Sequence, residues 1–394
     1  MSATKRIGGE YGKVRASIDV AKLNRFLASH VDVVKGPVDV KQFKFGQSNP
    51  TYFLTDTRGQ RFVLRKKPAG QLLSTTAHQI EREYTILDAL HKHNINPSTS
   101  PERRVPIPTP IYLCEDSAVI GTPFYIMEFL DGRIFTDAKM PEVPPKTRRE
   151  CWLSAVRALA ALGSLDPFAI GLSNFGPNTP YFPRQIKSLS RVSRAQAQAT
   201  DVESGKPTGE IPRYAELVAW YEAHLPDERK TGLRIVHGDY KLDNLVFHST
   251  ENRVIGILDW ELCTLGSPLA DLANMTLPWA VDALLLPKEF PASSALPGFK
   301  NAKDVPIELE DLEREYCHLT KQPYPIKEMV FTRSWMLFRL SVISQGIAAR
   351  YARRQASSEK AYIHVKLFPL IGQFAYIAQQ DAGKGTRHTI SPKL

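Results

Sequence analysis

The stretch from His237 to Asn244 decides most of what can be inferred from this chain, because it presents acidic and amide side chains in a defined order. It reads His237-Gly238-Asp239-Tyr240-Lys241-Leu242-Asp243-Asn244, and a further carboxylate, Asp259, ends the apolar run 255–258. Phosphoryl transfer needs a carboxylate that orients the acceptor hydroxyl, and an amide oxygen and a second carboxylate that bind Mg²⁺. These groups occur here in that order, as Asp239, Asn244 and Asp259.

The spacing within this set supports a common site. Four residues separate Asp239 from Asn244, so one loop can direct both side chains to the same place. The apolar run before Asp259 is predicted to be a strand that brings the second metal ligand beside them. The alternative is an Asx-rich turn that joins two strands and has no chemistry. The complete set of three groups favours catalysis over such a turn.

Composition indicates the kind of partner. The chain has 51 Lys and Arg against 41 Asp and Glu, a formal net charge of +10, which suits an anionic partner. Nucleic acid is the alternative, but the basic residues are scattered along the sequence. No apolar run approaches the ~18 residues of a membrane span, and the four cysteines lie far apart without a CxxC pair. We therefore expect a soluble protein that binds a small anionic molecule, with no nucleic acid and no membrane as partner.

The hydrophobic pattern predicts three regions. Residues 1–37 form a lead with a short helix, and residues 38–130 alternate short β-rich runs with one helix at 79–91. Residues 131–394 are mainly helical, and within them the polar segment 186–212 is predicted to be a mobile connection. The pattern is α+β, with a β-rich N-lobe at 38–130 followed by a larger, mainly helical C-lobe at 131–394.

The motif resembles that of the aminoglycoside phosphotransferase and choline kinase-like family, which shares the protein-kinase fold. Its members carry HGD-x4-N where protein kinases have HRD-x4-N, and an Asp followed by a residue other than Phe where kinases have DFG. This chain has Asp259-Trp260-Glu261 there, and the resemblance runs from about residue 38 to about residue 354. It implies a two-lobed, protein-kinase-like fold in which the N-lobe binds the nucleotide and the C-lobe carries the catalytic loop and the acceptor site. It also implies ATP and Mg²⁺ as cofactors, Asp239 as the catalytic residue, and Asn244 and Asp259 as the metal ligands.

Three further segments, 62–68, 121–128 and 346–351, resemble a subgroup that is fused, in some organisms, to acyl-CoA dehydrogenases. This resemblance implies a hydroxylated acyl substrate, such as a 4-hydroxyacyl-CoA or a hydroxy acid.

The family resemblance also places the phosphate-binding residues. Ser48 and Asn49 end the segment 46–49, which lies between two predicted strands where the family has its phosphate-covering loop; the alternative is an ordinary turn. Arg65 lies where kinases carry a strand lysine, and its guanidinium keeps the charge and adds a fork suited to phosphate. Lys66 points to the opposite face of the strand and is the alternative contact.

Other residues complete the predicted nucleotide site. Glu83 falls on the apolar face of its helix, where a carboxylate needs a partner, and Arg65 is the natural one; the alternative is a solvated helix charge. Glu128 begins a segment that resembles the inter-lobe hinge, whose backbone would bind adenine. Lys241 contacts the γ-phosphate or is a surface lysine. His237 is interpreted as a residue that packs the loop.

The favoured function is an ATP- and Mg-dependent phosphotransferase that phosphorylates a hydroxyl group of a small molecule. Two alternatives remain open. An atypical protein kinase would use the same phosphate machinery, but the segment 266–271 follows Asp259 too soon for an activation loop. A catalytically weak pseudokinase or scaffold would explain Arg65 in place of lysine, although the motif itself is intact.

The C-terminal residues Pro392-Lys393-Leu394 are a variant of the Ser-Lys-Leu address that a peroxisomal import receptor reads. Together with the link to acyl-CoA oxidation, they predict a peroxisomal location with that receptor as a partner. The alternative is a cytoplasmic protein that happens to end in Lys-Leu.

Overall fold

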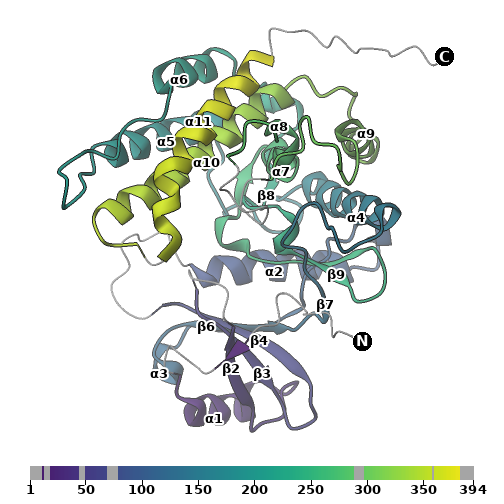
Figure 1. Cartoon of the computed structure of the whole chain (residues 1–394). Helices are drawn as coiled ribbons and strands as arrows, with labels where there is room; N and C mark the ends of the chain where they lie inside the picture. The colour runs from purple at the N-terminus through teal and green to yellow at the C-terminus, as the bar shows by residue number, and fades with distance from the viewer. Residues whose placement is uncertain are drawn as a thin grey trace. The chain divides into compact units, whose positions relative to one another are not determined.

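The computed structural model describes residues 11–12, 18–43, 49–68, 79–287, 297–356 and 359–381. Ser48 and the tail 392–394 lie outside these ranges, so the predictions for both stay predictions. The chain forms two compact units: Met1–Pro177 with His237–Thr264, and Asn178–Val236 with Leu265–Leu394. The first unit contains the main β-sheet and the second is mainly helical, as the α+β pattern predicted (Figure 1).

The first unit is built on a six-stranded antiparallel sheet with the strand order β1-β2-β3-β4-β6-β5. Its strands are β1 (Tyr11–Gly12), β2 (Asp39–Phe43), β3 (Thr51–Thr55), β4 (Arg61–Lys66), β5 (Pro110–Cys114) and β6 (Phe124–Glu128). Aromatic and β-branched residues dominate β3 and β6, as the β-rich texture of this region predicted.

The turn between β3 and β4 shows how local sequence sets the register of the sheet. Asp56 Oδ1 accepts hydrogen bonds from the backbone N–H groups of Arg58 and Gln60, both at 2.9 Å. Gly59 adopts a left-handed backbone with φ 77°, which glycine does without steric cost. The closed turn pairs Tyr52 with Leu64 across the two strands.

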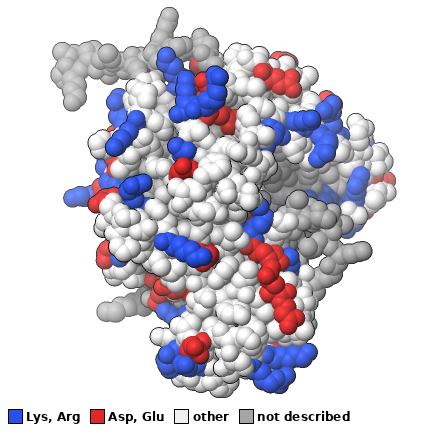
Figure 2. Space-filling view, turned by 180° about the vertical axis from the view of Figure 1, so that it is seen from behind, with Lys and Arg blue, Asp and Glu red and all other residues white. Residues whose placement is uncertain are grey.

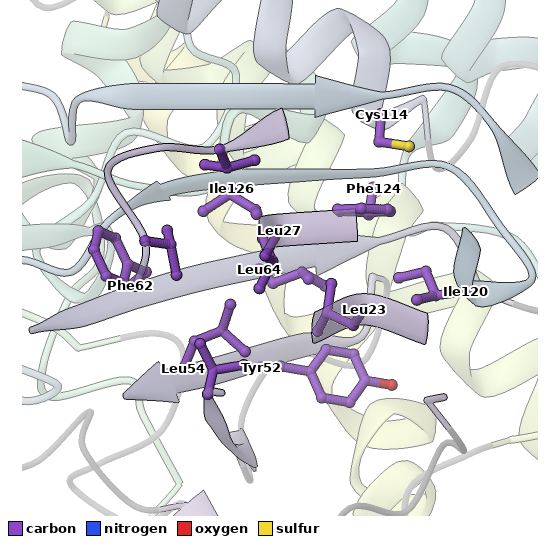
Figure 3. Packing of buried hydrophobic residues seen from close by; sticks show 13 residues of the cluster. Leu23, Leu27, Tyr52, Leu54, Phe62, Leu64, Cys114, Ile120, Phe124 and Ile126 are labelled. Carbon is purple, nitrogen blue, oxygen red and sulfur yellow. The ribbon is translucent and has the colours of Figure 1, made fainter. Parts of the chain in front are cut away.

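One face of the sheet is apolar and is covered by α1 (Val20–His30) and α3 (Ser117–Ile120). Helix α1 begins at Asp19, whose carboxylate accepts from the backbone N–H of Lys22 at 2.9 Å. Its fully buried Leu23 and Leu27 pack in one cluster with Leu64 and other strand residues (Figure 3). Helix α2 (Ile80–Ile95) lies on the other side of the strands (Figure 1).

A smaller sheet in the same unit carries the motif. Its strand order is β10-β9-β7. The elements are β7 (Gly132–Arg133), the 3-10 turn η3 (Leu242–Asn244), β9 (Leu245–His248), β10 (Val254–Ile257) and the 3-10 turn η4 (Trp260–Leu262). The predicted strand before Asp259 is therefore present as β10.

Helix α4 (Pro145–Ser164) anchors this sheet. The Tyr240 hydroxyl donates to the backbone carbonyl of Ala155 at 2.7 Å, and the Val254 N–H donates to Ser154 Oγ at 2.9 Å. The first bond connects the helix to the motif itself and the second to the start of β10, so α4 helps to fix the position of the motif.

The second unit is a helical bundle around α10 (Met329–Ala352), which packs against α11 (His364–Gln380), α5 (Tyr181–Ala197) and α7 (Leu269–Met275). The remaining helices of the unit are α6 (Tyr214–Ala223), η2 (Glu228–Lys230), α8 (Leu277–Ala280), α9 (Leu309–Thr320) and η5 (Glu359–Ile363). The short elements not yet given are η1 (Pro101–Arg103), β8 (Arg234–Val236) and β11 (Thr264–Gly266). Among the described helices, none has both the length and the apolar composition needed to cross a bilayer.

The prediction of a mobile connection at 186–212 was wrong. The first part of that segment belongs to α5, whose Ser190 and Ser193 are buried. Ser193 Oγ donates to the side-chain carbonyl of Gln345 on α10 at 2.8 Å. Small hydroxyl side chains allow two helices to approach closely while they remain hydrogen-bonded, whereas a hydropathy pattern counts them as solvent-exposed.

Candidate active site

Gly238 brings the motif against the turn that follows Asp259. Its backbone is left-handed, with φ 86°, and a Cβ atom at this position would lie 2.7 Å from the backbone oxygen of Leu262. Both the conformation and the close approach require glycine. The Gly in the motif therefore serves to hold Asp239 next to the segment that contains Asp259.

Asp239 and Asn244 are fixed to each other. The Asn244 side-chain amino group donates to the backbone carbonyl of Asp239 at 2.8 Å and to Asp239 Oδ2 at 2.9 Å. The turn η3 between them is closed by a bond from the Asn244 N–H to the Lys241 carbonyl. Because the amino group is used in this way, the amide oxygen of Asn244 is the atom left to bind a cation.

Lys241 lies between two carboxylates, 3.3 Å from Asp239 Oδ2 and 3.4 Å from Asp243 Oδ2. Burial lowers the pKa of Lys241, but the attraction of the two carboxylates outweighs it, so the pKa is raised. Burial also raises the pKa of Asp243, against the effect of Lys241. Sequence reasoning missed Asp243 because nothing in its spacing separates it from the loop around it.

His237 connects the motif to the strand before Asp259. Its ring is fully buried. Nδ1 accepts from the Asp239 N–H at 3.2 Å, so the proton of the neutral ring lies on Nε2, which donates to the Leu258 carbonyl at 2.9 Å. The Leu258 N–H in turn donates to the backbone carbonyl of Asn244 at 2.8 Å. The contacts of His237 are those of a residue that positions the loop.

Asp259 has a strained backbone at the end of β10. Its φ and ψ are 65° and 64°, a left-handed conformation that is uncommon for residues other than glycine, although aspartate adopts it more readily than most. The next residue, Trp260, helps to hold this turn by donating its indole N–H to the Ile257 carbonyl at 2.9 Å. Strain of this kind persists where the surroundings fix it, and such residues cluster at functional sites.

Arg65 forms a bridge between two carboxylates. Its Nη1 lies 3.0 Å from Glu83 Oε2, and its Nη2 lies 3.1 Å from Asp259 Oδ1. Glu83 is 1% exposed, and burial raises its pKa against the lowering effect of Arg65. Only a forked side chain can contact both acids with separate amino groups. Among the described residues, the buried Arg65 Nε has no hydrogen-bond partner.

Two further residues donate to Glu83, and both are fully buried. The Tyr125 hydroxyl donates to Glu83 Oε2 at 2.9 Å, and the Asn49 side-chain amino group donates to Glu83 Oε1 at 2.7 Å. The structure directs the amino group of Asn49 at Glu83, and the predicted phosphate contact of its segment stays a prediction. Tyr125 was missed, although it pairs directly with Arg65 across β4 and β6.

Lys66 occupies the other face of β4. It pairs with Phe124 across the strands, and the alternation of side chains places it on the face of Leu64. The lysine is 4% exposed, and burial lowers its pKa. Arg65, with Glu83 and Asp259 as its neighbours, is therefore the better placed of the two cations for a role at this site.

Glu128 ends β6 and uses its side chain locally. Glu128 Oε2 accepts from the N–H of Thr109 at 3.1 Å and from its hydroxyl at 2.8 Å. These bonds tie β6 to the residue before β5. The predicted adenine contact involves the backbone of this segment and stays a prediction.

Positive and negative side chains are intermixed on the face of the molecule that Figure 2 shows. Figure 2 shows Lys and Arg in several separate groups, with Asp, Glu and uncharged residues between them. Across the described residues, no group of three or more His, Cys, Asp or Glu side chains is arranged to hold a metal ion.

Comparison of the sequence with known proteins identifies the family of this chain. Residues 39–295 match the sequence model of the phosphotransferase enzyme family. The mouse protein "Acyl-CoA dehydrogenase family member 10" is 38% identical over 344 residues, which is 86% of this chain but only 29% of that protein. The chain thus spans less than a third of the length of this relative.

Solved structures give the fold. A crystal structure from Ralstonia eutropha, described as a candidate aminoglycoside phosphotransferase, aligns with a TM-score of 0.76 at 33% identity, covering 93% of this chain and 99% of that one. The GDP complex of an aminoglycoside 2′-phosphotransferase-IIIa variant aligns with a TM-score of 0.56 at 15% identity, covering 91% and 99%. The predicted protein-kinase-like α+β fold is confirmed.

Proposed function

Because the chain belongs to the phosphotransferase enzyme family, we propose that it transfers the γ-phosphoryl group of ATP to a hydroxyl group of a small molecule. The predicted family membership is confirmed, and the general reaction in this proposal is that of the family. One observation in this chain supports the proposal more specifically. Asn244 is hydrogen-bonded to Asp239 and joined through the backbone of Leu258 to the strand end at Asp259, which supports a common site for the three groups that the reaction needs.

Asp239 is the group that orients the acceptor. Its carboxylate receives a hydrogen bond from Asn244 and lies beside the Lys241 ammonium group. These contacts fix the direction of the carboxylate while it stays partly exposed. In this position it accepts the hydrogen bond of the acceptor hydroxyl and takes its proton as the phosphoryl group is transferred.

The residues present fit a magnesium ion. Mg²⁺ prefers oxygen ligands and is usually held by one or two carboxylates together with phosphate oxygens. Asp259 supplies a carboxylate and Asn244 supplies an amide oxygen that its other contacts leave available. Bound there, Mg²⁺ would neutralise charge on the phosphates. Arg65, whose buried Nε has no partner among the described residues, would add a fixed positive charge on the same side.

The acceptor is proposed to be a hydroxyacyl-CoA or a related hydroxy acid. The support comes from the name of the mouse relative, an acyl-CoA dehydrogenase family member, and from the positive net charge of this chain, +10. A CoA thioester carries several phosphate charges, so it suits a basic protein.

The test is a coupled assay of ATP consumption with a panel of acceptors: hydroxyacyl-CoAs, free hydroxy acids, choline, aminoglycosides and sugars. We expect turnover with a hydroxylated acyl compound and its phosphorylated product by mass spectrometry. Asp239→Asn should lower kcat by roughly 10²–10⁴ and leave the Mg-ATP thermal shift intact. Asp88→Asn, which changes an ion-paired aspartate on α2, is the matched control and should behave like the wild type.

The outcomes separate the alternatives. Mg-ATP binding without turnover on any acceptor would favour a pseudokinase, and phosphorylation of protein substrates alone would favour an atypical protein kinase. If Asp239→Asn kept more than about a tenth of the wild-type kcat, the assignment of Asp239 would be wrong.

A further inference from the structure

We propose that Asn49 and Tyr125 are positioning residues that keep the Arg65–Glu83 ion pair in a single-contact geometry, so that the second amino group of Arg65 stays directed at Asp259. The inference rests on the proposed function, because it concerns how the phosphate-binding side of that site is arranged. It assigns to Asn49 a role that differs from phosphate binding.

The first step of the argument is the geometry of the ion pair. A free carboxylate and a guanidinium prefer a two-bond contact in which two N–H groups face two oxygens. Arg65 and Glu83 do not pair in that way: Nη1 faces Glu83 Oε2, and Nη2 faces Asp259 Oδ1. The buried pair therefore needs something that prevents the two-bond contact.

The second step identifies what prevents it. Asn49 donates to Glu83 Oε1, and Tyr125 donates to Glu83 Oε2. Asn49 thus turns Oε1 toward its own amide, and Oε2 is the oxygen that contacts both the phenol and Arg65. The remaining amino group of Arg65 is then available to Asp259.

The third step concerns how firmly the two donors are held. Tyr125 lies within β6, directly opposite Arg65. Asn49 precedes β3, where the Thr51 hydroxyl donates to the Asn49 carbonyl at 3.0 Å and the Lys66 N–H donates to the Pro50 carbonyl at 3.1 Å. Both donors are thus fixed by the sheet and do not depend on Glu83 for their position.

The experiment compares Asn49→Ala and Tyr125→Phe with the wild type. Each variant removes one donor and allows Glu83 to take both amino groups of Arg65. We expect each to lower kcat/KM for ATP about tenfold or more, as loss of a hydrogen bond to a charged group does, with the larger part in kcat. Asn49→Asp should be worse than Asn49→Ala, because it sets a carboxylate against Glu83.

Two controls are matched to these changes. Tyr84→Phe removes a phenol from the residue next to Glu83, and Asn96→Ala removes an exposed amide that accepts only from Ser98 at the far end of α2. Both should keep wild-type kinetics. Melting temperatures of all variants show whether a loss of activity reflects unfolding.

The decisive experiment repeats both substitutions in a protein that also carries Glu83→Gln. In Glu83→Gln, the neutral side chain no longer competes for a two-bond contact, so adding Asn49→Ala or Tyr125→Phe should change kcat/KM by less than about twofold. A merely structural role would lower the melting temperature equally in both backgrounds. Equal kinetic losses in both backgrounds, or wild-type kinetics in the single variants, would overturn the inference.

The two proposals fail in different ways. If calorimetry shows that the wild type binds neither Mg-ATP nor Mg-ADP, the proposed function fails. If the wild type binds and turns over ATP while Asn49→Ala and Tyr125→Phe do the same at equal rates, only the positioning inference fails.

Discussion

The two faces of the six-stranded sheet differ in kind although the same strands build both. On one face, Leu64 is fully buried and packs with the leucines of α1. On the other, its neighbour Arg65 bridges Glu83 and Asp259. The first face contributes apolar burial, whereas the second combines buried apolar residues such as Val63 with fixed charges. Because adjacent residues of a strand point to opposite faces, stability and chemistry can be altered here by changing neighbouring positions.

The largest effect is expected from Arg65→Ala. The change leaves Glu83 buried without its cation, which should lower the free energy of unfolding by about 3–5 kcal/mol and weaken Mg-ATP binding. Chemical denaturation and calorimetric titration measure the two effects. Arg61→Ala on the same strand is the control: Arg61 pairs with Asp131 at the surface, so less than about 1 kcal/mol should be lost. A similar loss in both variants would show that the buried bridge of Arg65 contributes no more to stability than a surface ion pair.

Leu64→Ala tests the apolar face. Loss of this buried side chain should cost about 2–5 kcal/mol of unfolding free energy through lost burial and a residual cavity. The folded fraction should nevertheless bind Mg-ATP with wild-type affinity, because Leu64 points away from Arg65. Binding measured well below the melting temperature checks this expectation. A large fall in affinity without unfolding would show that the two faces are coupled.

The smallest effect is expected from Lys66→Met, which replaces a buried lysine on the apolar face with an apolar side chain of similar length. Unfolding free energy should change by less than about 1.5 kcal/mol, and Mg-ATP affinity should stay the same. If affinity fell as far as in Arg65→Ala, Lys66 would be the phosphate contact.

The pH dependence of Lys66→Met sharpens the same comparison. Burial lowers the pKa of Lys66 in the folded protein, so the unfolded chain holds this proton more tightly. The wild type therefore gains stability as the pH rises through the folded-state pKa of Lys66. The stability of Lys66→Met relative to the wild type should be greatest below that pKa and fall above it. The expectation would be wrong if the difference in unfolding free energy between Lys66→Met and the wild type stayed constant up to the highest pH at which the wild type remains folded.

Sequence reasoning went furthest where the pattern is local. Strand alternation separated Arg65 from Lys66, and helical spacing put Glu83 on the inward face of its helix; the structure brings Arg65 and Glu83 into contact. The order of Asp239, Asn244 and Asp259 was likewise a local feature.

What depends on pairing across the sheet could not be predicted in the same way. Tyr125 donates to Glu83 only because β6 pairs with β4 in a register that places it opposite Arg65. The strands are far apart in sequence, so their register is set by packing and by the intervening loops. The hydrogen bond from Asn49 to Glu83 was missed for a similar reason, since a motif gives the position of a residue but not the direction of its side chain.

The left-handed backbone of Asp259 has a consequence for protein engineering. Glycine adopts this conformation freely, whereas aspartate and asparagine adopt it at some cost, although a smaller one than most residues. A selection of variants for heat resistance alone would therefore tend to replace Asp259, because relief of the strain would be rewarded while the carboxylate would go untested. Any stabilised version of this protein should be screened for nucleotide binding at the same time, or this position should be excluded from the library.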